Sequence, residues 1–139
     1  MSTTTLKINT EVRATIQKVW NCYNLSEHIT KWNFASLDWC CPFAENNLVV
    51  GGKLKSRMEA KDGSFGFDFE ATYTEIVEYA LIAYTLSDGR KVKTTFTNNN
   101  GIVEIEIGFE AENQNSLDMQ QAGWQAILTH FKNYTENTP

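Results

Sequence analysis

Alternating apolar and polar residues open the chain. The segment TLKINTEVRA places Leu6, Ile8, Thr10 and Val12 on one face and charged or amide side chains on the other. A period of two residues predicts a half-buried β-strand. Two short helices are expected next: IQKVWNCY, capped by Thr15, and EHITKW, capped by a serine, Ser26.

The first hairpin is predicted by the turn signal KDGS, in which Asp62 and Gly63 form a two-residue turn. Counting outward from this turn sets apolar residues opposite apolar ones and basic residues opposite acidic ones: Ala60 with Phe65, Met58 with Phe67, Ser56 with Phe69, Arg57 with Asp68 and Lys55 with Glu70. Such pairing is typical of two strands in the correct register.

Two further turns extend the sheet. Asn100-Gly101 fits a type I′ turn, and Gly89 fits the left-handed position of a three-residue loop. The resulting pairs are Phe96 with Ile105, Thr94 with Ile107, Val92 with Phe109, and Tyr84 with Val92. The segment YTEIVEYALIAY requires a β-bulge, because Tyr73 and Ile76 have opposite parity, and its register stays open.

A long amphipathic helix is predicted to begin near Ser116. Its apolar residues recur at helical spacing: Trp124, Ile127, Leu128, Phe131 and Tyr134. An antiparallel sheet with one apolar face can bury that face against such a helix by curling around it. The predicted fold class is therefore α+β, with a curved sheet gripping the C-terminal helix.

Composition and charge narrow the function. The 139 residues fit one domain, 1–139, with 42% hydrophobic and 21% charged residues, which is typical of a globular protein. The net charge of -5 argues against nucleic-acid binding, which depends on clustered Lys and Arg. Without a signal peptide or an apolar run of roughly 18 residues, we expect a cytoplasmic protein with no membrane partner.

The stretch DWCCPFAENN, residues 38 to 47, concentrates the chemically reactive groups. The cysteines, Cys22, Cys40 and Cys41, have no C-x-x-C spacing, and His28 and His130 are far apart in sequence. This pattern predicts neither a disulfide framework nor a metal site. No cofactor is expected.

The chain resembles the START-like or SRPBCC superfamily, and within it the branch named after the activator of the heat-shock ATPase, whose bacterial members are often labelled polyketide-cyclase-like. The motifs that carry the resemblance run in order along the chain: KVW, SEHITKW, GGKL, RMEAKDGSFGFDF, YTEI and GWQAILTHFKNY. The resemblance implies the helix-grip fold, with an apolar cavity between sheet and C-terminal helix.

The resemblance also implies a loop after the second helix that roofs this cavity, and DWCCPFAENN lies there. Relatives often carry a histidine between the Trp and the Pro of this stretch, where this chain has Cys40 and Cys41. Histidine chemistry at the rim is therefore not expected. We instead expect Trp39 and Phe43 to turn inward beside a turn stiffened by Pro42.

The first functional hypothesis is the binding of a small hydrophobic molecule in this cavity. The predicted ligand-binding residues are Asp38, Trp39, Phe43, Met58, Phe67, Phe69, Tyr84, Thr94, Phe96 and Trp124. Further inner-face candidates are Thr10, Ser56, Phe65, Tyr73, Ile105 and Phe109. The competing interpretation is that these rings and hydroxyls simply pack the core.

Two alternatives stay open. The same cavity can serve a cyclase, dehydratase or hydrolase if an acid or base points into it, and Asp38 and Glu45 are the nominated carboxylates. No nucleophile, base and orienting group converge in the sequence, so catalytic residues are unknown. A co-chaperone-like interaction module is the third hypothesis, suggested by the name of the family.

Overall fold

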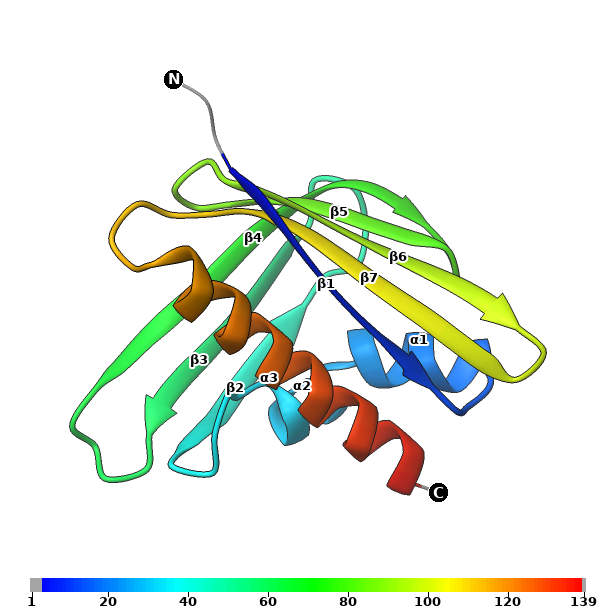
Figure 1. Ribbon diagram of the computed structural model, residues 1–139, viewed down its shortest axis with the longest axis horizontal. Coiled ribbons are helices and arrows are strands. Elements are labelled where there is room, and N and C mark those ends of the chain that lie inside the picture. Colours follow the sequence, from blue (N-terminus) through cyan, green and yellow to red (C-terminus); the bar gives the residue numbers. More distant parts are fainter. Residues whose placement is uncertain (1–3, 139) are drawn as a thin grey trace.

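The computed structural model describes residues 4–138 and contains a seven-stranded antiparallel sheet that curls around a long C-terminal helix (Figure 1). The elements in chain order are β1 (Thr5–Val12), α1 (Ile16–Asn24), α2 (Ser26–Trp32), β2 (Trp39–Asn46), β3 (Lys53–Ala60), β4 (Gly66–Val77), β5 (Leu81–Leu86), β6 (Lys91–Asn99), β7 (Ile102–Glu110) and α3 (Leu117–Asn137). The strand order is β1-β7-β6-β5-β4-β3-β2. The predicted α+β class and helix-grip arrangement are confirmed.

The caps of the helices follow the sequence only in part. The Thr15 hydroxyl accepts a hydrogen bond from the Lys18 N–H at 3.2 Å, and Ser116 caps α3 by accepting one from the Met119 N–H at 3.1 Å. The predicted Ser26 cap is wrong, because Ser26 is already the first residue of α2. Leu25 alone separates the two short helices, so its backbone ends α1 and begins α2.

The hairpin registers predicted from side-chain pairing are confirmed. Met58 lies opposite Phe67, Tyr84 opposite Val92, and Phe96 opposite Ile105. Asn100 and Gly101 both have positive φ, at 54° and 88°, as a type I′ turn requires. The expected bulge lies in β4, where the register against β5 shifts between Tyr73 and Glu75.

The stretch 38–47 is not the predicted loop. Residues Trp39–Asn46 form β2, an edge strand paired with β3, with a register shift between Cys40 and Phe43. Pro42 lies within this irregularity, where its missing N–H interrupts no regular ladder. The turn-forming residues were misleading because an edge strand tolerates both proline and a bulge.

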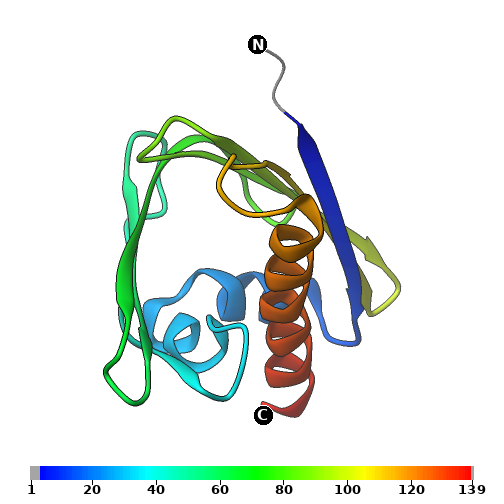
Figure 2. The same cartoon turned by 60° about the vertical axis from the view of Figure 1, so that its left-hand side comes forward.

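Helix α3 packs along β1 and crosses the concave face of the sheet, whereas α1 and α2 close one end of the curl (Figure 2). The core beneath α3 is dense, and Val103, Ile105, Phe109 and Phe131 are fully buried. Between residues 4 and 138, none of the helices combines the length and the hydropathy needed to cross a membrane.

Candidate functional site

A cavity of about 240 Å³ lies on the concave side of the sheet, where strands, α3 and the two short helices meet. Its walls are mainly apolar and aromatic. The lining residues are Tyr23, Asn24, Ile29, Trp32, Asn33, Asn46, Leu54, Met58, Phe67, Phe69, Tyr73, Ile82, Tyr84, Arg90, Ile107, Trp124, Ile127 and Leu128.

Aromatic rings from neighbouring strands form one wall of the cavity. Tyr84 on β5 meets Phe69 and Tyr73 on β4 edge to face, at centroid distances of 6.2 and 6.0 Å. On the opposite wall, the Trp124 indole of α3 stacks on Phe109 with 4.2 Å between the ring centroids. Edge-to-face and stacked contacts of this kind are favourable aromatic arrangements, and here they set the orientation of the rings along the cavity wall.

The side of the cavity near the β3–β4 hairpin is less covered. Phe67 is 41% exposed although its parity places it on the inner face. Leu54, Phe69, Trp124 and Ile127 are half-buried, whereas Ile82 and Leu128 are buried. Half-exposed apolar side chains therefore surround the approach to the cavity.

Most polar groups in the lining are satisfied within the protein. The Tyr73 hydroxyl donates to Asn46 Oδ1 at 2.6 Å, and Asn46 Nδ2 donates to the Asn24 carbonyl at 2.7 Å. Asn33 Nδ2 donates to the Ser56 hydroxyl at 3.2 Å. Burial raises the pKa of Tyr73, so this phenol is a neutral donor. The two Asn46 bonds attach the edge strand β2 to β4 and α1, and the Asn33 bond attaches the end of α2 to β3.

Two lining groups retain unused hydrogen-bonding capacity. Tyr84 is only 6% exposed, and among the described residues no group hydrogen-bonds to its hydroxyl. Burial raises the pKa of Tyr84 well above its ordinary value, so the hydroxyl keeps its proton. Arg90 donates through Nε to Asp88 at 2.8 Å and through one terminal nitrogen to the Glu110 carbonyl at 3.3 Å.

Half of the predicted ligand-binding residues border this cavity: Met58, Phe67, Phe69, Tyr84 and Trp124. Thr94 and Phe96 face inward as predicted but lie in the packed core. The Thr94 hydroxyl is 3.4 Å from the Tyr23 hydroxyl, and Phe96 packs edge to face against Trp20 and Tyr23.

The three candidates from the stretch 38–47 lie outside the cavity lining. Asp38 is exposed, and Phe43 is 53% exposed because it pairs with Arg57, which faces outward. Trp39 does face inward, but at the far end of the sheet, where it packs against Phe67 and its neighbour on the hairpin, Phe65, at 6.0 Å. Its connection to the cavity is therefore indirect, through Phe67.

Sequence reasoning missed the part of the lining that comes from α1 and α2. Tyr23, Ile29 and Trp32 were assigned to short helices without a predicted inner face. Arg90 was missed as well, although it has the same parity as Val92 on the inner face of β6. That parity was the one signal that pointed to Arg90.

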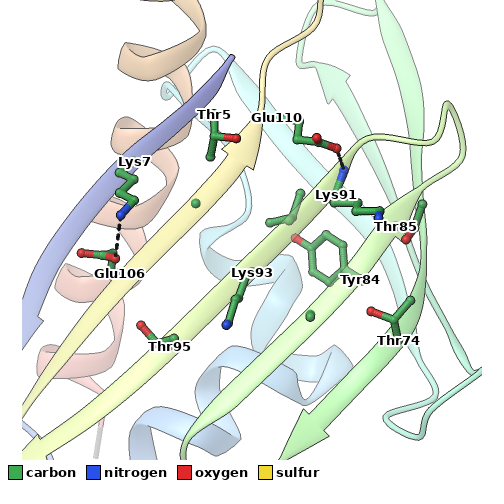
Figure 3. Close-up of a pocket in the computed structure, with 13 residues that line it drawn as sticks. Thr5, Lys7, Thr74, Tyr84, Thr85, Lys91, Lys93, Thr95, Glu106 and Glu110 are labelled. Atoms are coloured by element: carbon green, nitrogen blue, oxygen red, sulfur yellow. Dashed lines mark hydrogen bonds and ion pairs between the residues drawn. The ribbon is translucent and has the colours of Figure 1, made fainter. Parts of the chain in front are cut away.

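A second, larger hollow of about 600 Å³ lies on the outer face of the sheet (Figure 3). Lysine, threonine and glutamate residues make up most of its lining, and Tyr84 borders it as well as the inner cavity. The charged residues include the Lys7–Glu106 pair at 3.9 Å and Glu110, which accepts from the Lys91 N–H at 2.7 Å. Exposed, mutually paired charges are typical of the solvated face of a sheet. We therefore place the candidate site in the inner cavity despite its smaller volume.

The nominated carboxylates, Asp38 and Glu45, do not line the cavity, and neither do His130 and the cysteines. Glu45 is exposed on β2, and His130 Nδ1 is hydrogen-bonded to the Phe34 carbonyl oxygen. Cys22 and Cys41 are buried free thiols, and burial raises the pKa of both. Within residues 4–138, no three His, Cys, Asp or Glu side chains come close enough together to hold a metal ion.

Comparison with known proteins agrees with this fold. The solution structure of an AHSA1-like protein from Aeromonas hydrophila is 39% identical, with a TM-score of 0.86 over 94% of this chain and 92% of that one. A solution structure from Cytophaga hutchinsonii is 45% identical, with a TM-score of 0.81 over 94% and 91%. A crystal structure from Chromobacterium violaceum, at 20% identity and a TM-score of 0.84, shares the fold.

No protein with a curated function matched. The sequence model of one family matches residues 13–136, nearly the whole of the chain, and its description is Activator of Hsp90 ATPase homolog 1-like protein. This match includes both short helices, the sheet from β2 to β7 and α3. The chain therefore belongs to the Activator of Hsp90 ATPase homolog 1-like family.

Proposed function

We propose that the protein binds a small hydrophobic molecule in the cavity between the sheet and α3. The observation that carries this proposal is the cavity itself, about 240 Å³ in volume with mainly apolar walls. This volume lies below the range of about 300 to 1,000 Å³ for drug-sized ligands, so the ligand is small. Half-exposed rings beside it supply apolar surface that a ligand would cover.

The lining favours binding over catalysis. Among the described residues that border the cavity, none is an aspartate, glutamate, histidine, cysteine or lysine. General acid–base or nucleophilic chemistry draws mainly on these side chains. Cyclase, dehydratase and hydrolase activities therefore have less support than binding. No surface feature described above favours the co-chaperone-like alternative.

Native mass spectrometry tests the proposal on protein purified from its own host. Retention of a small apolar molecule, lost on denaturation, is the expected result. A complementary titration uses octanol as a neutral probe, followed by chemical shifts of residues such as Ile82 and Leu128. Shifts scattered over the outer face instead of the cavity would contradict the proposal.

A matched pair of variants locates the binding. Ile127→Trp adds bulk at the half-buried cavity edge, whereas Thr129→Trp adds the same side chain on the exposed face of the same helix. Octanol affinity is expected to fall in Ile127→Trp and to persist in Thr129→Trp. An equal loss of octanol affinity in both variants would mean that the substitutions act by disturbing α3 and not by filling the cavity.

A further inference from the structure

If the cavity binds a small molecule as proposed above, its lining also selects the polar end of that molecule. The cavity has apolar walls, yet the Tyr84 hydroxyl, on a side chain that is 94% buried, has no hydrogen-bond partner among the described residues. Thr135 Oγ1 is the one fully buried side-chain oxygen or nitrogen without a partner in the described part of the chain, so the Tyr84 hydroxyl oxygen is not sealed off and can be reached from the cavity. An unpaired hydroxyl on the wall of a binding cavity is therefore available to a ligand.

The neighbouring Tyr73 shows that the cavity does satisfy other hydroxyls. Its ring lies 6.0 Å from that of Tyr84, and its hydroxyl donates to Asn46 at 2.6 Å. Asn46 in turn donates to the Asn24 carbonyl. The absence of a partner is thus specific to Tyr84 rather than general to the tyrosines of this wall.

Arg90 provides the only formal charge among the described lining residues. It precedes Val92 by two residues, and Val92 pairs with Tyr84, so Arg90 and Tyr84 are diagonal neighbours on the inner face. Diagonal neighbours lie about 7 to 8 Å apart at their backbones, within reach of a long side chain. The guanidinium and the phenol can therefore approach the same group of a ligand.

The Arg90 guanidinium is not saturated by its protein partners. Of the five N–H groups of an arginine, one donates to Asp88 and one to the Glu110 carbonyl, which leaves three free among the described residues. The Asp88 side chain is 53% exposed and does not line the cavity, whereas the Arg90 side chain is 25% exposed. Arg90 therefore borders the cavity as a guanidinium that is ion-paired to Asp88 through Nε and keeps N–H groups free for a second anionic partner.

We propose that the ligand carries a carboxylate or a similar anionic oxygen group, which accepts a hydrogen bond from the Tyr84 hydroxyl and faces Arg90. The rest of the molecule lies against Phe69, Ile107 and Trp124. A planar guanidinium with free N–H groups is suited to a carboxylate, and a neutral phenol is a donor to it. A cationic head group finds no acidic partner in the lining.

A probe series with one chain length tests this assignment. Octanoate, octanol and octylamine are titrated against the full chain by calorimetry at neutral pH. Octanoate is expected to bind about tenfold or more tightly than octanol, because hydrogen bonds to a charged group contribute about 1.5 to 3 kcal/mol. Octylamine is expected to bind most weakly.

Variants separate recognition of the head group from general stability. Tyr84→Phe removes only the hydroxyl and should lower octanoate affinity about tenfold without lowering the melting temperature of the free protein. Arg90→Gln should abolish the preference for octanoate over octanol. Arg57→Gln removes the same charge from a residue outside the lining and should leave that preference intact.

The outcomes distinguish the two proposals. Equal affinity for octanoate and octanol, or a preference that survives both Tyr84→Phe and Arg90→Gln, overturns the head-group assignment while apolar binding stands. Failure of all three probes to bind overturns the assignment together with the binding function. A preference that disappears equally in Arg57→Gln reflects net charge and also overturns the assignment.

Discussion

The two halves of the sheet carry the same alternating pattern but differ in how they are covered. In β7, the inward-facing Val103, Ile105 and Phe109 are fully buried, and Phe109 stacks on Trp124 of α3. In β4, the inward-facing Phe67 is 41% exposed and Phe69 is half-buried. We call β1, β6 and β7 the covered half and β2 to β4 the open half, with β5 between them.

The alternation of apolar and polar residues along the strands therefore predicts which face of the sheet is apolar. It does not predict which part of that face a helix covers. A single helix of 21 residues can cover only part of a curled seven-stranded sheet. Apolar surface in the open half stays in contact with solvent, and covering it with a ligand releases water at a gain of about 25 cal/mol per Å². Apolar residues of the two halves should therefore differ in how much they contribute to the free energy of unfolding.

Two phenylalanines on inward-facing strand positions give the largest expected contrast. Phe109→Ala should destabilise the fold by about 3 to 5 kcal/mol, because it leaves a cavity under Trp124. Phe67→Ala should cost about 1 kcal/mol or less, since its ring is already partly in solvent. Urea unfolding measures both, and equal losses would remove the distinction between the halves.

Leu128 lies where the covered half meets the cavity. It is 2% exposed and also borders the cavity, so Leu128→Ala should cost about 2 to 5 kcal/mol and enlarge the cavity. In this variant, decanol should gain affinity relative to octanol, which calorimetry can measure. A stability loss below about 0.5 kcal/mol would mean that this face of α3 is not in the core.

The two tyrosines of the cavity wall, Tyr73 and Tyr84, allow the stability contributions of two single hydroxyl groups to be compared. Tyr73→Phe should cost about 1 to 3 kcal/mol, because it leaves Asn46 Oδ1 without its donor. The same change at Tyr84 removes no protein hydrogen bond and should be close to neutral in the free protein. Parallel thermal and urea unfolding checks this, and a reversed order would contradict the hydrogen-bond assignment.

The smallest expected effect lies at the C-terminal end of α3, beside β1. Glu136 accepts hydrogen bonds from Lys132 Nζ at 2.8 Å and from the Arg13 N–H at 2.9 Å, and these hold the pKa of its carboxyl below the ordinary value. At neutral pH, Glu136→Gln should cost about 0.5 kcal/mol, as for other exposed i,i+4 pairs.

The pH dependence of Glu136 has a definite sign. A carboxyl whose pKa is lower in the folded than in the unfolded chain stabilises the fold above its unfolded pKa. That contribution is lost as the pH falls through the lower, folded pKa. Urea midpoints of wild type and Glu136→Gln should therefore converge on acidification, and a constant difference would show that the carboxylate does not act through its charge.

Local chemistry made most of the fold predictable. Turn residues such as Asn100 and Gly89 determine hairpin geometry, and the pairing of apolar and charged side chains then determines register. The spacing of apolar residues located α3 and its N-terminus at Ser116. The stretch 38–47 was misassigned because the signals for a loop and for an irregular edge strand are the same, namely proline and polar residues.

The candidate site was only half predictable for a different reason. Strand parity places Phe69 and Tyr84 on the inner face, and both border the cavity. Parity places Thr94 and Phe96 there equally well, yet Tyr23 from α1 packs over them and keeps them out of the cavity. Which inner-face residues border empty space depends on where three helices lie across the sheet.

The sequence alone therefore predicts the strands from β3 to β7, the face that each side chain occupies, and every hairpin register in this part of the sheet except that of β4 against β5. These features follow from contacts between neighbours along the chain or across one turn. The tertiary structure adds that α3 crosses the concave face of the sheet, that β2 is an edge strand, and that Tyr84 and Arg90 border one cavity with hydrogen-bond donors unused. Those features depend on packing between elements distant in sequence, and no local pattern encodes the volume that such packing leaves unfilled.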